Sequence, residues 1–495
     1  MTGTTHSAVA CSGIRGGGCG TIGPVVGILG TPAISVIGGT GTIYLVTYSQ
    51  DTGGNYYHYL HAINIQSITE EIPPVLIAPP GQNASTFSKE HIQRPGLLLA
   101  NGYLYIAFSM MDGYLPPYPN GAVFGYNTAN LTATPLYFQT TQGLLSGSNG
   151  GGIWQGGAAP AYGQDSTGTS FIYLKTANGS FDGSSNWGDT FLKLSPATLT
   201  VPSSGYFTPA DQYYRSTPSC KYSYEKNASG QYYKSPQPGD MDFGSGGVML
   251  IPDNNLLSWP YLAVSGDKEG GIWFNDRTVP ATPPHVTTCD PQTCQCSAAD
   301  GAVQSYWTAL ANFGPVIHNS PAYWQGGGSS YLYMSTSDFG TLQLHGKLTR
   351  YSLCSTANSQ HPISATCGPS EDAVDASPAT VNFTYGVTPG ISAASSAASD
   401  AIVWAIWGDG SVSGSTSPAV LYAFDAADTS AKGTLDELYS STNTTCASDA
   451  MTAPATKFSV PTVANGYVYV GTQGAIGGSS TSGSFYIFGL NRTCQ

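Results

Sequence analysis

Two carboxylates two residues apart, Asp240 and Asp242, are the first feature of this chain with a clear chemical use. In an extended segment such side chains point to the same side of the strand, about 6 to 7 Å apart. Carboxyl groups at roughly that separation can hydrolyse a glycosidic bond. The same residues could equally cap turns, or meet Arg94 or Lys268 in a polar network. The catalytic and polar-network interpretations both place the two acids near the centre of the fold.

Other candidates stand in Gly-rich segments. Lys268 and Glu269 belong to a charge cluster in a chain with only 9% charged residues, and such clusters are typical of solvated turns. His318 suits either a base or a hydrogen-bonded structural position, and Trp154 could stack a planar ring or pack between strands. Buried charges are tolerated mainly as pairs, so we expect these groups to share one polar mouth. The expected binding residues are Arg94, Trp154, Asp240, Asp242, Lys268, Glu269 and His318.

Metal sites and nucleophiles are only weakly indicated. Asp182, Asn186 and Asp189 offer oxygen ligands that suit Ca²⁺, although they are also ordinary turn residues and the twelve-residue calcium loop is absent. Cys289, Cys294 and Cys296 could hold zinc, but their C-x4-C-x-C spacing favours disulfides. The chain has no G-x-S-x-G nucleophile turn and no C-x-x-C-H haem motif.

The charge balance excludes some partners. A net charge of −13 and a pI near 4.8 oppose binding to nucleic acid or anionic lipid. No apolar run reaches membrane-spanning length, so we expect no membrane insertion. The first residues, MTGTTHSAVACSG, lack a signal-peptide pattern, and we expect Met1 to begin a mature or trimmed form.

Cysteines and glycosylation motifs together predict a secreted or surface-exposed protein. The cysteines are Cys11, Cys19, Cys220, Cys289, Cys294, Cys296, Cys354, Cys367, Cys446 and Cys494. We predict the disulfides Cys11–Cys19, Cys354–Cys367 and Cys446–Cys494, and leave the pairing of the other four open. The N-x-[ST] acceptors are Asn83, Asn130, Asn178, Asn227, Asn382, Asn443 and Asn491.

A repeated strand pattern must position all of these residues. Each repeat has a small or Pro-containing strand start, an aromatic-centred β-run and a third run, as in TIYLVT followed by YLHAINI. The central aromatics are Tyr44, Tyr105, Tyr173, Tyr261, Tyr333, Trp404 and Tyr469. Repeats of strands alone indicate a β-propeller. We predict an all-β, seven-bladed propeller with long disulfide-stapled loops, closed by pairing of the two chain ends.

The domain boundaries follow from the repeats. Residues 1–24 form a Gly-rich, cysteine-bearing segment, and residues 25–495 are expected to form one propeller domain. The long interruptions at 196–239, 278–312 and 355–382 hold five of the ten cysteines. We expect those cysteines to staple loops that bury little apolar surface of their own.

Several motifs resemble those of exported bacterial proteins with quinoprotein-like, PQQ-repeat-like β-propellers. They include HIQRPGLLLANGYLYIAFS, GGIWQGGAAPA, DMDFGSGGVMLIPD, GDKEGGIWFNDR and KFSVPTVANGYVYVGTQ, and the likeness runs from about residue 25 to 490. The resemblance implies a quinoprotein-like propeller outside the cell, and no established reaction. Quinone dehydrogenases of that superfamily hold the quinone between a Trp and adjacent cysteines, and no two cysteines here are adjacent. We therefore expect no bound pyrroloquinoline quinone.

Three functions remain open from the sequence. The first is a secreted binding protein for a glycan, peptide or neighbouring subunit. The second is an enzyme with an axial pocket, either a quinoprotein-like oxidoreductase or a carbohydrate-active enzyme. The third is a scaffold subunit of an extracellular homopolymer or surface layer, which low charge and glycan acceptors favour.

Overall fold

The structure of the protein is a computed structural model. It describes residues 5–10, 25–111, 119–142, 150–209, 212, 224–226, 232–234, 241–252, 259–278, 289–290, 295–296, 304–307, 316–326, 329–337, 346–353, 374–375, 381, 383, 386–395, 400–408, 417–426, 434–442, 449–456, 459–473 and 483–489.

Antiparallel sheets account for nearly all of the regular structure, and from the third sheet on the strands pair in chain order. The first sheet contains β1 (His6–Ala10), β2 (Val25–Val26), β3 (Ala33–Ile37), β4 (Thr40–Asp51), β5 (Tyr56–Asn64), β6 (Thr69–Glu70) and β7 (Val75–Leu76). The second contains β8 (His91–Ile92), β9 (Leu98–Ala100), β10 (Tyr103–Met110), β11 (Ala122–Asn127) and β12 (Leu136–Gln139). The third contains β13 (Ala161–Gln164), β14 (Ser170–Lys175), β15 (Phe191–Leu194) and β16 (Tyr206–Phe207).

The later sheets repeat this order. The fourth contains β19 (Met249–Leu250), β20 (Leu262–Gly266), β21 (Gly271–Asp276) and β24 (Gln304–Trp307). The fifth contains β25 (Ala322–Gly326), β26 (Ser329–Ser335), β27 (Leu348–Ser352) and β28 (Val374–Asp375). The sixth contains β29 (Gly390–Ala393), β30 (Ala401–Trp407), β31 (Val420–Asp425) and β32 (Glu437–Ser440). The last contains β33 (Thr462–Ala464), β34 (Tyr467–Gly471) and β35 (Phe485–Gly489).

Small elements fill the long connections. Two hairpins pair β17 (Tyr224–Lys226) with β18 (Tyr232–Lys234), and β22 (Cys289–Asp290) with β23 (Gln295–Cys296). The helix α1 (Ala84–Glu90) begins after Asn83, whose side-chain oxygen accepts a hydrogen bond from the Thr86 amide. A 3₁₀ turn, η3 (Gln155–Gly157), precedes β13.

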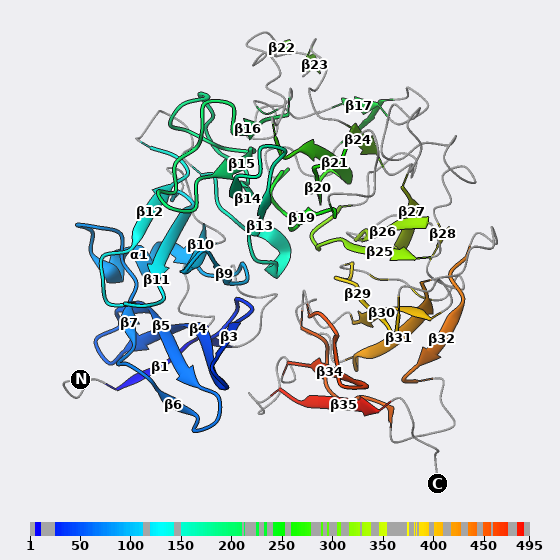
Figure 1. The fold of residues 1–495 in the computed structure, drawn as a ribbon, viewed down its shortest axis with the longest axis horizontal. Helices are drawn as coiled ribbons and strands as arrows, with labels where there is room; N and C mark the ends of the chain where they lie inside the picture. The colour runs from blue at the N-terminus through cyan, green and yellow to red at the C-terminus, as the bar shows by residue number, and fades with distance from the viewer. Residues whose placement is uncertain are drawn as a thin grey trace.

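The sheets succeed one another around a circle, so that the first and last lie beside each other (Figure 1). Contacts between consecutive first strands run from β3 to β9, from β9 to β13 and on to β19, and again from β25 to β29 and β33. This radial succession of antiparallel sheets is the architecture of a β-propeller. The predicted all-β propeller fold is therefore confirmed.

Proline and the central aromatics set the register of each sheet. Pro32, Pro160, Pro321, Pro389 and Pro461 each directly precede a first strand. Proline is tolerated there because a first strand is an edge strand and needs no ladder donor at its start. The residue after each of these prolines pairs with the central aromatic of the next strand, as Ala33 does with Tyr44. Six of the seven aromatics lie on second strands.

Tyr261 is the exception, because it stands one residue before β20. Aligning YLAVSG with YLYIAF shows that Ala263 occupies the place held by Tyr105 in the second sheet. The fourth sheet therefore carries a small residue at that place, and its bulk comes instead from the fully buried Trp273 on β21.

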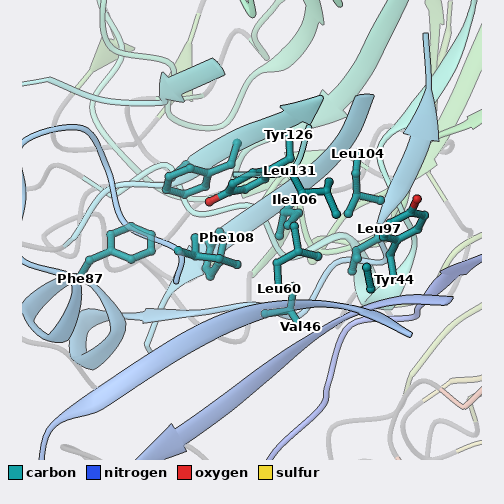
Figure 2. Packing of buried hydrophobic residues seen from close by; sticks show 14 residues of the cluster. Tyr44, Val46, Leu60, Phe87, Leu97, Leu104, Ile106, Phe108, Tyr126 and Leu131 are labelled. Carbon is teal, nitrogen blue, oxygen red and sulfur yellow. The ribbon is translucent and has the colours of Figure 1, made fainter. Parts of the chain in front are cut away.

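The core consists of separate layers between consecutive sheets. Tyr44, Val46 and Leu60 of the first sheet pack against Leu104, Ile106 and Phe108 of the second (Figure 2). Equivalent layers join each following pair of sheets as far as the sixth and the last. Every second residue along β5 is buried, and this alternation presents one apolar face to the neighbouring sheet.

Pairing of the chain ends, which we expected to close the ring, does not occur among the described strands. β1 pairs with β4 and β2 inside the first sheet, and β35 pairs with β34. β1 thus joins the first sheet although it comes from the segment set apart as residues 1–24. Of the cysteines, only the backbones of Cys289 and Cys296 are described, so the predicted disulfides lie outside the described residues.

Candidate functional site

The predicted binding residues sit on connections at one end of the sheets. Strand direction alternates, so the connection before a first strand and the connection between second and third strands lie at the same end. Arg94, Trp154, Asp242 and His318 precede first strands, and Lys268 and Glu269 lie between β20 and β21. We call this end the loop face; it comprises residues 93–97, 150–158, 175–190, 241–248, 267–270 and 316–320. Asp240 lies outside the described residues.

Backbone hydrogen bonds join these connections to one another. The Gly96 amide donates to the carbonyls of Gly157 and Ala158, at 3.1 and 3.0 Å. The Gln155 amide donates to the Gly244 carbonyl at 3.1 Å, and the Ile317 amide donates to the Asp267 carbonyl at 2.9 Å. The loop face is therefore one continuous, backbone-lined surface.

Asp242 forms an ion pair with Lys268. Lys268 Nζ lies 3.1 Å from Asp242 Oδ2, with side-chain exposures of 17% and 11%. The Asn178 amide also donates to Asp242 Oδ1 at 3.3 Å, and the Lys268 amide donates to the Asp242 carbonyl at 3.2 Å. This agrees with the polar-network interpretation of Asp242.

The neighbouring Asp267 holds the turn that carries Lys268 and Glu269. It is fully buried, and its carboxylate accepts hydrogen bonds from the Glu269 amide at 3.1 Å and the Gly271 amide at 2.7 Å. Trp273 Nε1 donates to its other oxygen at 2.7 Å. Three donors compensate the burial of this charge, so Asp267 is a structural acid. Glu269 beside it is also buried.

Two further buried charges at this face were not anticipated. Lys175 is fully buried, with Nζ donating to the Gly266 carbonyl at 3.3 Å and lying 3.4 Å from the centre of the Phe243 ring. Asp189, also fully buried, accepts a hydrogen bond from the Phe243 amide at 3.1 Å. A possible signal was the position of Lys175 at the end of FIYLK, directly after three buried residues of the same strand.

Trp154 is covered on one side. The Arg94 guanidinium lies 5.2 Å from the centre of its ring, and the Trp side chain is only 6% exposed. Trp154 also belongs to a buried apolar cluster with Tyr48, Met111 and Ala177. A planar cofactor would have to displace Arg94 to stack there. These contacts support the packing interpretation of Trp154. His318 is also buried.

The proposed calcium residues make other bonds. Asp182 accepts hydrogen bonds from the amides of Ser184, Ser185 and Asn186, and these bonds hold the pKa of its carboxyl below the ordinary value despite partial burial. Asn186 Nδ2 also donates to Asp182, which gives a closed Asx turn. Within the described ranges, no three His, Cys, Asp or Glu side chains are grouped to hold a metal. Calcium binding stays a prediction.

The described glycosylation motifs differ in exposure. Asn83 and Asn130 are exposed on connections, whereas Asn178 is half-buried in the loop face. Asn227, Asn382, Asn443 and Asn491 lie outside the described residues. In the described part of the chain, no helix has the length and apolar character needed to cross a membrane.

The two outermost sheets expose apolar side chains. On β35, Tyr486 and Phe488 pack toward the sixth sheet, while Phe485 and Ile487 between them are 67% and 55% exposed. On β3, Ile34 and Val36 are 58% and 69% exposed. Exposed side chains at alternate positions share one sheet face. We call these the terminal faces, defined by Ile34 and Val36 on the first sheet and by Tyr467, Phe485 and Ile487 on the last.

The sheets, the inter-sheet layers and the loop face define a β-propeller. No protein-family model and no curated protein sequence matches the chain. Among solved structures, BamB from Moraxella catarrhalis is similar with a TM-score of 0.42 and 9% identity, covering 94% of this chain and 84% of that one. BBS1N in complex with ARL6DN gives a TM-score of 0.37 and 8% identity over 99% and 96% of the two chains. The Dos1 propeller gives 0.30 and 11% over 72% and 65%.

Proposed function

We propose that this protein is a secreted, glycosylated, seven-bladed β-propeller that acts as an extracellular scaffold, binding a neighbouring copy of itself through its terminal faces. The observation that carries the proposal is the exposure of Phe485 and Ile487 on the last sheet and of Ile34 and Val36 on the first. Large apolar side chains that share one sheet face are rarely left exposed together unless a partner covers them.

The loop face supports the same conclusion by its chemistry. Its charges are engaged inside the molecule: Asp242 with Lys268, Asp267 with three donors and Lys175 with the Phe243 ring. Such contacts hold loops together. The enzymatic alternatives, a quinoprotein-like oxidoreductase or a carbohydrate-active enzyme, would require Lys268 to release Asp242 or Arg94 to leave Trp154.

Secretion and glycosylation rest on the ten cysteines and the sequons. Asn83 and Asn130 are the acceptors we expect to be occupied, because both are exposed on connections. Glycans there would stand away from the terminal faces, so they would leave assembly possible while shielding other surfaces.

Sedimentation velocity over a range of concentrations tests the proposal. We expect the native chain to associate reversibly, and the double variant Phe485→Lys, Ile487→Lys to remain monomeric, because charge on both partners cannot be buried there. Ile68→Lys changes a 75% exposed apolar side chain in the turn before β6, outside the terminal faces, and this matched control should associate like the native chain. A native chain that stays monomeric at every concentration would overturn the assembly proposal.

A further inference from the structure

A second site lies on the flank of the molecule, where residues 184–187 of the loop face meet β12, and it is separate from the terminal faces. A cavity of about 570 Å³ opens between β12 of the second sheet and two connections of the third, residues 184–187 and 198–201. Its size falls in the range of small-molecule sites. None of the seven predicted binding residues lines it.

The lining carries no formal charge. Its polar side chains are amides and hydroxyls, including Gln139, Gln142, Ser184 and Thr200, and its aromatic walls include Tyr137 and Trp187. An anionic ligand would lose its hydration there without gaining a counter-charge. Amides and hydroxyls both donate and accept, so they match a ligand whose own groups do both.

The polar groups are held in place by neighbours. Tyr137 donates its hydroxyl hydrogen to Gln139 Oε1 at 3.3 Å, and Gln139 Nε2 donates to the Thr141 carbonyl at 2.7 Å. One amide hydrogen of Gln139 is left over from these bonds, because the side-chain amide has two. The backbone amide of Gln142 donates to Asn186 Oδ1 at 2.8 Å, and the Gln142 side chain is exposed.

The aromatic and hydroxyl sides of the cavity are equally fixed. Trp187 packs against Tyr206, with ring centres 4.9 Å apart, and against Phe181 at 6.2 Å. Ser184 and Ser185 donate both amide and hydroxyl hydrogens to Asp182, which leaves their hydroxyl oxygens able to accept. Preorganised groups of this kind lower the ordering cost of binding.

We propose that this cavity binds a neutral oligosaccharide. Sugar rings have apolar C–H faces for the aromatic walls and adjacent hydroxyls that donate and accept for the amides and hydroxyls of the lining. The site is independent of the proposed assembly, since it shares no residue with the terminal faces.

Isothermal titration calorimetry with a panel of neutral hexasaccharides, of β-1,4-glucose, β-1,3-glucose, β-1,4-xylose and α-1,4-glucose, tests the proposal. We expect at least one to bind, and Gln139→Ala or Gln142→Ala to weaken its affinity about fivefold each, the effect of losing one neutral hydrogen bond. The exposed Gln82, before α1, supplies the control Gln82→Ala, which should bind normally. A heparin hexasaccharide should not bind.

Three results would overturn the inference: no binding by any neutral member of the panel, equal binding by heparin, or affinity unchanged in both glutamine variants. Thermal unfolding of each variant shows whether the fold is intact. The double variant Phe485→Lys, Ile487→Lys should keep its oligosaccharide affinity, so failure of the assembly proposal and failure of this one are distinguishable.

Discussion

Residue type alone gives the wrong expectation for the burial of some charged side chains. Lys175 and Asp189 are fully buried in the loop face, although charged residues next to turns are usually solvated. The sequence located Asp242 and Lys268 near each other because both stand in distinctive Gly-rich motifs. It could not show that Asp267, rather than Asp242, is the acid with three donors, since those donors come from the fold of the turn.

His58 is a buried residue that residue chemistry alone did not single out. It is fully buried against Tyr48, with ring centres 4.5 Å apart, and neither ring nitrogen has a hydrogen-bond partner among the described residues. Burial, followed by repulsion from His91, lowers its pKa to about 3. Alternation along YYHYL could have revealed its burial, because His58 shares a side with Tyr56 and Leu60.

The low pKa of His58 predicts acid sensitivity. The unfolded chain binds a proton at this residue near pH 6.5 while the folded protein stays neutral, so stability falls as the pH drops from about 6.5 toward 3. Between pH 7 and pH 5 we expect a loss of about 2 kcal/mol in the free energy of unfolding from this group. His58→Phe should remove that part of the pH dependence in urea titrations. The exposed His6→Phe is the control, and an unchanged pH slope in His58→Phe would contradict the prediction.

Lys193 and Asp165 form a buried ion pair within the third sheet. Their charged atoms are 2.7 Å apart, with side-chain exposures of 6% and 4%, and Lys193 also lies 4.0 Å from the centre of the Phe171 ring. Lys193→Met should cost about 3 to 5 kcal/mol in chemical denaturation, because Asp165 is left buried without its partner. Adding Asp165→Leu should restore much of that loss. Equal stability of Lys193→Met and the native chain would show that the pair is not buried in solution.

At the scale of elements, the central aromatics located the second strand in six of the seven sheets. They work because a bulky side chain on each second strand fills the layer between neighbouring sheets. Tyr261 did not mark a second strand, because the fourth sheet has Ala263 at the position of the central aromatic. Trp273 fills the layer between the sheets instead. The short helix α1 and β1 left no comparable signal, since neither has a long periodic pattern.

Two connections of the loop face approach closely at Gly156, so we expect the stability of the protein to depend strongly on this glycine. Gly156 has a φ of 56°, and a β-carbon on it would lie 2.2 Å from the His318 carbonyl oxygen. Gly156→Ala should therefore destabilise by clearly more than the roughly 1 kcal/mol expected from its backbone angle alone. Gly168, with a φ of 79° and open space around it, is the matched control. Comparable thermal unfolding of the two alanine variants would mean that the two connections do not touch.

At the scale of the whole molecule, the sequence predicted the radial arrangement because self-similar strand units can bury their faces only against one another. It could not predict the exposed terminal faces, since these depend on how the first and last sheets meet. The pairing of Cys220, Cys289, Cys294 and Cys296 was equally beyond what their spacing could predict. The structure now places the Cys289 backbone opposite that of Cys296 across a two-residue ladder.

That register predicts a disulfide between Cys289 and Cys296, because residues directly opposite in an antiparallel pair lie within bridging distance. Peptide mapping of unreduced protein by mass spectrometry should find the two cysteines in one linked peptide pair. Thiol titration of denatured, unreduced protein should find all ten cysteines oxidised. Two or more free thiols would contradict the secreted-protein account.

The central claim is that the terminal faces bind a neighbouring copy of this chain. An experimental density map of the protein purified from its natural surroundings is the most direct measurement. The account predicts seven radial sheets, with polypeptide density of a second copy covering Phe485 and Ile487. A lone particle in which the first and last sheets simply close on each other would contradict it, as would a planar cofactor with calcium stacked on Trp154.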